Sequence, residues 1–125
     1  MGISPHEFRH ILSHFASGVT IVTTREEDGS PSGLTASAFA SVSLDPPLVL
    51  VCVDRAAQSY PALLSNGHFA INILTSEQEP FARRFATKRD DKFDGIRYQA
   101  GHLGMPVLEE ALAVLECRTV HTYAG

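Results

Sequence analysis

Three runs rich in β-branched and aliphatic residues follow one another in the first half of the chain, separated by turn residues. Val19 to Thr24 is β-branched almost throughout, and Asp28-Gly29 supplies the turn of a hairpin. A second run extends from about Gly33 to Val42. After the break at Asp45-Pro46-Pro47, Leu48 to Val53 is a continuous apolar run typical of a strand buried on both faces. Short strands with a hairpin, rather than regular β-α-β spacing, favour an antiparallel arrangement.

Helix signals lie outside these runs. Ser4-Pro5-His6-Glu7 predicts a helix start with Ser4 as N-cap and Glu7 closing a capping box, and Gly18 ends that helix. Ser59-Tyr60-Pro61 opens a short helix that Asn66-Gly67 closes. His68 to Leu74 is a further strand.

The last third of the sequence is less regular. Ser76 and Glu79 predict a second capping box, although the helix that carries Phe81 and Phe85 could instead begin at Pro80. A polar, charged loop follows to about Gly104. A short helix or turn around Glu109-Glu110 then leads into a last strand from Leu112 to Tyr123.

Together these elements predict one domain over residues 1–125, of the mainly-β α+β class and built as an antiparallel barrel. The pattern contains about five strand signals, and the sequence ends directly after the last of them. A small closed barrel needs six or more strands, with every edge paired. We therefore expect the domain to continue beyond Gly125 or a partner subunit to cover the open edge, and we favour a C-terminal truncation.

Composition narrows the classes of function. The net charge is −4 and the pI is about 5.8, which gives nucleic acid no broad basic surface to bind. No apolar run approaches the ~20 residues of a membrane span, and the N-terminus lacks a signal peptide. Cys52 and Cys117 lie far apart in apolar stretches, which indicates two reduced, buried thiols. We expect a cytoplasmic protein.

The sequence lacks the familiar catalytic motifs. It contains no Gly-x-Gly-x-x-Gly, P-loop, Gly-x-Ser-x-Gly, Cys-x-x-Cys or His-Glu-x-x-His pattern. His6, His10 and His14 recur at helical spacing, but no carboxylate or cysteine accompanies them at ligand spacing, so we expect no metal site. A cofactor that carries its own reactivity would need none of these motifs.

Two stretches could hold such a cofactor. Residues 33–43 are mostly small, and small side chains let a flat ring approach the backbone while hydroxyls bond its rim; the same pattern also fits a tightly packed strand. Residues 54–59 lead into the helix that starts at Ser59, and the free N–H groups of a helix N-terminus can bind a phosphate. An ordinary capping serine beside a solvated arginine has the same pattern. Lys88, Arg89 and Lys92 form a mixed loop with three aspartates, from which one cation could reach a phosphate.

Several blocks of sequence resemble the flavin reductase-like family, whose members have an FMN-binding split barrel. They are Gly33 to Phe39, SVSLDPPLVLVCVD at 41–54 and RFATKRDDKF at 84–93, together with Phe15 to Thr20 and Leu115-Glu116-Cys117. The resemblance covers essentially the whole chain. It implies an antiparallel split β-barrel with flanking helices, usually as a homodimer with flavin near the subunit boundary.

The resemblance also implies an activity. Members are commonly reductase components of two-component flavin monooxygenases, which use NADH or NADPH to reduce FMN or FAD and release the reduced flavin to a partner oxygenase. Relatives continue past the position of Gly125 with a Gly-Asp-His segment on the nicotinamide side. A flavin-binding carrier or sensor on the same barrel is the alternative, and a structural domain without flavin is a second one.

The family's binding residues can be placed on this sequence one by one. Those expected to line the flavin ring and its ribityl chain are Thr35, Ala36, Ser37 and Ala38, where many relatives have asparagine in place of Ser37. The backbone of Val51, Cys52 and Val53 would face the cofactor, and Phe85 and Ala86 would border it. Gln58 and Ser59 would hold the phosphate, with Arg55 nearby. Lys92 would be a phosphate or structural cation. No catalytic side chain is expected, because orientation of the two rings and backbone electrostatics supply the catalysis.

Overall fold

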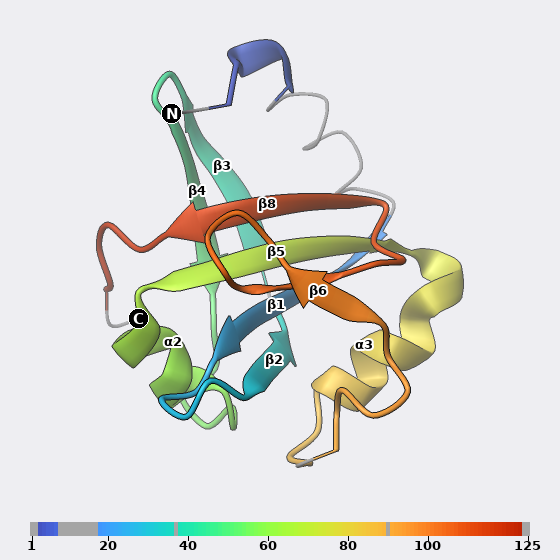
Figure 1. Ribbon diagram of the computed structural model, residues 1–125. Helices are drawn as coiled ribbons and strands as arrows, with labels where there is room; N and C mark the ends of the chain where they lie inside the picture. Colours follow the sequence, from blue (N-terminus) through green and yellow to red (C-terminus); the bar gives the residue numbers. More distant parts are fainter. Residues whose placement is uncertain (1–2, 8–17, 37, 90, 124–125) are drawn as a thin grey trace.

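The computed structural model describes residues 3–7, 18–36, 38–89 and 91–123. Its centre is a four-stranded antiparallel sheet in the order β2-β1-β5-β8 (Figure 1). The strands are β1 (Gly18–Arg25), β2 (Pro31–Thr35), β5 (His68–Thr75) and β8 (Ala113–Arg118). The predicted hairpin at Asp28-Gly29 is confirmed, since it joins β1 to β2 and Gly29 has a φ of +88° in the left-handed region.

The predicted strand from Gly33 to Val42 is two strands in different sheets. After β2, the Ala36 N–H donates to the Thr20 carbonyl at 3.1 Å, and the chain then leaves the central sheet. Among the described residues, β3 (Ala38–Leu44) pairs only with β4 (Pro47–Cys52), in a separate two-stranded ribbon. The turn of this ribbon extends past β8 in Figure 1. Periodicity alone could not find the break, because both strands are built from the same small and β-branched residues.

β4 is not buried on both faces, as its apolar sequence predicts. Its residues alternate between half-buried and exposed, and Leu48 and Leu50 are 38% and 47% exposed. The reason is tertiary: Val49 and Val51 pack against a core cluster of the central sheet, while nothing among the described residues covers the opposite face of the ribbon. A strand needs layers on both sides to be buried on both faces.

The central sheet has a hydrophobic cluster on each face. Val22 and Ile21 are neighbours on β1 but belong to different clusters, because successive side chains in a strand point to opposite faces. One cluster is Val22, Leu34, Phe39, Ile71, Ile73 and Leu115, and it includes the ribbon residue Phe39. The other is Ile21, Leu74, Phe85 and Leu108, and it includes side chains from the helix α3 (Glu79–Phe85) and from the strand β7 (Pro106–Leu108).

Two of the three predicted helix starts are confirmed. The Ser4 hydroxyl accepts the Glu7 N–H at 3.1 Å, as an N-cap does, and donates to the Glu7 carboxylate at 2.9 Å, where a full capping box would have that carboxylate accept the Ser4 backbone N–H. Residues 8–17, which complete that predicted helix, lie outside the described residues. The helix α2 (Tyr60–Asn66) follows Ser59 and ends at Gly67, whose φ is +79°.

The third helix start is wrong by one or two residues, depending on which of the two predicted starts is compared. A 3-10 turn, η2 (Ser76–Gln78), leads into α3 (Glu79–Phe85), so the helix begins neither with Ser76 as N-cap nor at Pro80. The Gln78 side chain accepts the Thr75 N–H at 2.8 Å. The Gln78 side chain therefore closes the turn between β5 and η2, and it makes no capping bond to α3. Phe81 and Phe85 pack against the same cluster, as their spacing predicts.

The predicted polar loop contains a small antiparallel hairpin. Its strands are β6 (Tyr98–Ala100) and β7 (Pro106–Leu108). Side chains from the central sheet hold it: the Asn72 Oδ1 accepts the Leu108 N–H at 2.9 Å, and the Glu116 carboxylate accepts the N–H groups of His102 and Leu103 at 3.0 and 2.8 Å. A turn at Glu109-Glu110 is confirmed, and the last strand ends at Arg118 rather than Tyr123. The mainly-β α+β class is confirmed.

The two cysteines differ. Neither forms a disulfide, as predicted, but Cys52 is exposed on the ribbon and not buried, because it lies on the uncovered face of β4. Cys117 is half-buried, and burial raises the pKa of its thiol to about 12, so it stays protonated at neutral pH. Among the described helices, none has both the length and the apolar composition needed to cross a bilayer.

Candidate functional site

A polar pocket of about 350 Å³ lies where the β1–β2 hairpin, the segment before α2 and the loop after α3 meet. The sequence-predicted residues Gln58, Ser59 and Lys92 all line it, although 33 positions separate Ser59 from Lys92 in the sequence. The remaining lining residues are Glu26, Ser30, Pro31, Ser32, Gly33, Arg89 and Phe93. Three predicted residues thus meet at one concave surface, which also contains hydroxyl and cationic groups suited to an anion.

Lys92 is the buried cation of this pocket. It is 5% exposed, and its Nζ donates to the carbonyls of Gly33 and Phe85, each at 3.0 Å. Desolvation lowers the pKa of its ammonium group. The two ion pairs of the described residues join Arg83 to Glu79 and Arg89 to Asp91, so neither compensates Lys92. A buried ammonium that pairs with none of the described carboxylates would be stabilised by an anion in the pocket.

Ser59 lies beside Lys92 but is not free to act as a simple phosphate donor. Its hydroxyl donates to the Gly33 carbonyl at 2.8 Å and accepts the Ser32 hydroxyl at 2.7 Å. It makes no side-chain capping bond to α2. The start of the helix also offers few free donors, since the Tyr60 N–H donates to the Ala57 carbonyl and Pro61 has none. Anion binding would rest on side chains more than on the helix terminus.

The small-residue stretch predicted to receive a ring lies at the junction between the central sheet and the ribbon. Thr35 and Ala36 are half-buried, and the Thr35 hydroxyl donates to the Ala82 carbonyl of α3. Ser37 lies outside the described residues. The backbone of Ala38 pairs with Cys52, so two predicted binding segments are neighbours across the ribbon. We call the described part of this stretch, Thr35, Ala36 and the backbone of Ala38, the shelf.

The other predicted residues are placed less uniformly. Val51 and Val53 are half-buried against the first core cluster. Arg55 is exposed and does not line the pocket. Phe85 is fully buried, and its ring packs against Gly33 in β2, just before the shelf. Ala86 is exposed at the end of α3.

Sequence reasoning missed Ser32 as a lining residue of the pocket, and it included Gly33 only as the first residue of the small-residue stretch. One signal was available, because a glycine inside a strand pattern often marks a close approach of another group. A Cβ on Gly33 would lie 2.8 Å from two ring carbons of Phe85. Phe93, another lining residue, contacts the Phe85 ring edge-on at a centroid distance of 5.0 Å. No local pattern indicates that contact.

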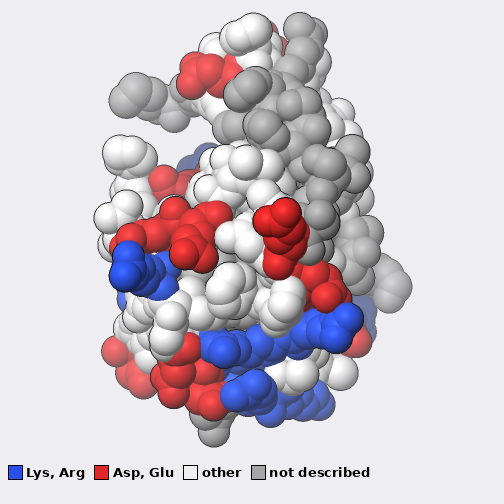
Figure 2. Space-filling view, turned by 90° about the vertical axis from the view of Figure 1, so that its right-hand side faces the viewer, with Lys and Arg blue, Asp and Glu red and all other residues white. Residues whose placement is uncertain are grey.

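Positive charge gathers around this end of the molecule. The segment from Arg83 to Arg97 contains six of the ten Lys and Arg residues of the chain. Figure 2, which shows the side with α3, has a band of lysine and arginine at the lower end, flanked by acidic side chains. A local excess of cations on an acidic protein favours the approach of an anionic ligand. Among the described residues, no group of three or more His, Cys, Asp and Glu side chains could hold a metal; His10 and His14 lie outside these residues.

Comparisons with known proteins agree with this architecture. Residues 12–125 match the model of the flavin reductase like domain, and the chain belongs to this family. It is 38% identical over 123 residues to the reductase subunit HsaB of a flavin-dependent monooxygenase from Mycobacterium tuberculosis, covering 98% of this chain and 65% of that protein. It is 45% identical over 119 residues to the reductase component of a 4-nitrophenol monooxygenase from Rhodococcus opacus, covering 95% of this chain and 63% of that protein.

A solved relative has the same fold. The NADH:FAD oxidoreductase of Streptomyces globisporus C-1027, in complex with NAD and FAD fragments, superposes with a TM-score of 0.78 at 36% identity. The match covers all of this chain and 78% of that one. The chain thus spans somewhat less than two thirds of the curated relatives above.

Proposed function

We propose that the protein is an NAD(P)H:flavin oxidoreductase that supplies reduced flavin to a monooxygenase. The observation that supports this most directly is the polar pocket with the buried Lys92, which no carboxylate of the described residues pairs with, next to a shelf of small residues, in a chain of the flavin reductase like family. When bound, the flavin accepts hydride from the nicotinamide. Relatives named as reductase components of monooxygenases support the proposed partner.

The residues of this chain fit an anionic flavin. Gln58 and Arg89 line the rim of the pocket and Lys92 its interior, so they would hold a phosphate group. The ring and ribityl chain would lie along Thr35, Ala36, Ser37 and Ala38, with backbone of residues 51–53 on the neighbouring strand. These groups bind and orient; no side chain is needed as acid or base. Titration of the protein with FMN and with FAD measures which flavin is preferred. The same comparison of NADH with NADPH measures which nicotinamide is preferred.

The direct test mixes the purified protein with NADH and FMN and follows absorbance at 340 nm. We expect NADH to be consumed at a rate proportional to protein concentration. Flavin binding without NADH consumption would favour a carrier or sensor instead. If FMN, FAD and riboflavin all keep their free fluorescence in the presence of the protein, the proposal of a flavin site fails.

Charge reversal at the pocket rim tests the phosphate site. Gln58→Glu keeps the size of an exposed side chain and adds one negative charge. We expect FMN to bind roughly tenfold more weakly, about 1.4 kcal/mol, while riboflavin, which has no phosphate, changes little. The matched control is Gln99→Glu on the exposed strand β6, which should affect neither ligand. Equal weakening of FMN and riboflavin by Gln58→Glu would contradict a phosphate at this rim.

The proposed homodimer has a candidate surface. On β3 and β4, the side chains opposite the core are apolar and exposed: Ala40, Val42, Leu48, Leu50 and Cys52. Exposed apolar patches of this kind mark interaction sites. Two copies packing through the ribbon would place the shelf, which lies at the end of β2 and the start of β3, near the subunit boundary. Sedimentation equilibrium of the purified protein measures whether the dimer forms.

A further inference from the structure

The Gly33 carbonyl is the meeting point of three segments that are distant in the sequence. It accepts the Ser59 hydroxyl at 2.8 Å and the Lys92 ammonium at 3.0 Å, so both lone pairs of the oxygen are used. The same ammonium donates to the Phe85 carbonyl at the end of α3. Lys92 therefore ties β2 to α3 through two backbone carbonyls, and its side chain is almost completely buried.

Two further contacts restrict the same stretch of backbone. Gly33 lies so close to the Phe85 ring that a Cβ would be 2.8 Å from it, and two residues later the Thr35 hydroxyl donates to the Ala82 carbonyl. β2 is thus held to α3 at Gly33 and at Thr35. The shelf starts at Thr35, and beyond Ala36 the chain leaves the central sheet. The position of the shelf consequently depends on these contacts.

We propose that Lys92 is a positioning residue, whose ammonium fixes the Gly33 carbonyl and the end of α3 so that the shelf keeps the conformation that receives a flavin ring. The inference rests on the proposed function. It differs from a role as a phosphate cation, because two of the three donors of the ammonium are already used by carbonyls. Lys92 then acts on the ring of the flavin, through the backbone, and not only on its phosphate.

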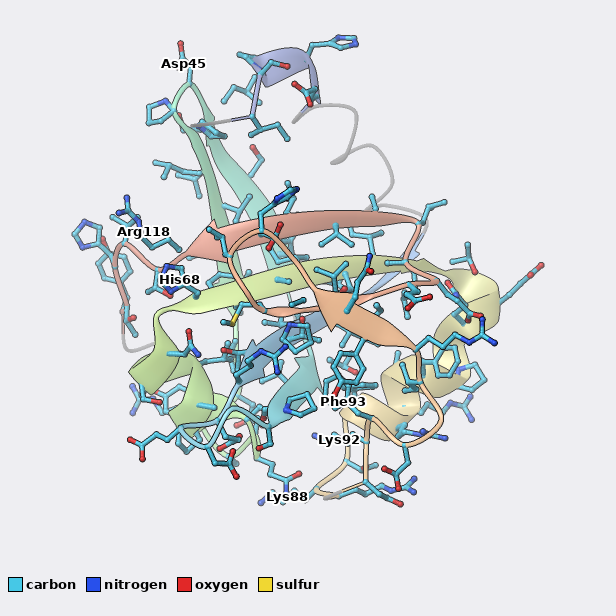
Figure 3. All side chains as sticks on the ribbon, in the orientation of Figure 1. Asp45, His68, Lys88, Lys92, Phe93 and Arg118 are labelled. Carbon is cyan, nitrogen blue, oxygen red and sulfur yellow. The ribbon has the colours of Figure 1, made fainter. Side chains whose placement is uncertain are left out.

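The test compares riboflavin with FMN, using quenching of flavin fluorescence. In Lys92→Met, a side chain of similar length without charge, we expect riboflavin to bind roughly tenfold more weakly, which corresponds to losing hydrogen bonds to a charged group, and FMN, which has the phosphate as well, to weaken by at least that factor. The control is Lys88→Met, an exposed lysine of the same loop that lies further from the sheet in Figure 3 and that lines no part of the pocket. It should leave riboflavin binding unchanged.

The outcomes are separable. Weakening of FMN alone would make Lys92 a phosphate contact and overturn the inference, as would unchanged binding of both ligands. If the wild-type protein binds neither flavin, the proposed function itself fails. Thermal unfolding followed by circular dichroism recognises a change that only destabilises the protein. If the variant is almost fully folded at the assay temperature, unfolding cannot explain a loss of affinity for both flavins. Should Lys92→Met fail to fold, Lys92→Arg retains the charge, and the bulkier guanidinium should still weaken both flavins equally.

Discussion

Replacing Phe85 with alanine is expected to lower the free energy of unfolding by about 3–5 kcal/mol, as large-to-small changes at fully buried aromatic sites do. The Phe85 ring has no exposed surface and belongs to the cluster of Ile21, Leu74 and Leu108. It also contacts Phe93 edge-on and lies under Gly33. Rigid strands and a helix surround the site, so the cavity cannot easily collapse. Urea unfolding of the two proteins measures the difference.

Phe81→Ala is the matched control, since Phe81 lies on the same helix and packs against the same cluster but is only half-buried. We expect a clearly smaller loss for this variant. If Phe81→Ala and Phe85→Ala lower the free energy of unfolding equally, the complete burial of Phe85 against β2 does not explain its contribution to stability. Because Phe85 supports Gly33, its loss should also weaken flavin binding in whatever fraction of Phe85→Ala stays folded.

The second large effect is expected at Asn72, a polar residue with no exposed surface on β5. Its amide donates to the Ile21 carbonyl at 3.1 Å and to the Thr23 hydroxyl at 3.0 Å, while its Oδ1 accepts the Leu108 N–H of β7. Asn72→Leu keeps the size of the side chain but leaves these buried groups without their partner. We expect a loss of about 3 kcal/mol in the free energy of unfolding, since each orphaned group costs ~1–3 kcal/mol.

The control for this variant is Asn66→Ala, at the end of α2. Asn66 is half-buried, and its two hydrogen bonds, to the Arg25 carbonyl and from the His68 N–H, are both 3.3 Å long. We expect a loss of about 1 kcal/mol or less there. Hydrogen exchange at the β6–β7 hairpin adds a local measurement, because Asn72→Leu should speed exchange of the Leu108 amide. Unchanged exchange would mean that Asn72 does not hold the hairpin.

Local signals in the sequence were sufficient for the hairpin at Asp28-Gly29, the end of α2 at Gly67 and the N-cap at Ser4. Each depends on residues within a few positions of one another, so the chemistry that decides them is visible in a short window. The strand β5 was predicted for the same reason, since the sequence from His68 to Leu74 is mostly apolar. The family resemblance rested on short blocks of this kind.

Tertiary structure alone decided the features that depend on distant partners. β2 and β3 were predicted as one strand, and β6 and β7 were missed, because their pairing is set by Thr20, Cys52 and Asn72 at other places in the sequence. The same holds for the candidate site. The sequence identified Ser59 and Lys92 as polar residues near possible ligands, but only folding joins both to the Gly33 carbonyl. Short-range chemistry determines turns and caps, whereas contacts across the sheet determine where a buried charge lies.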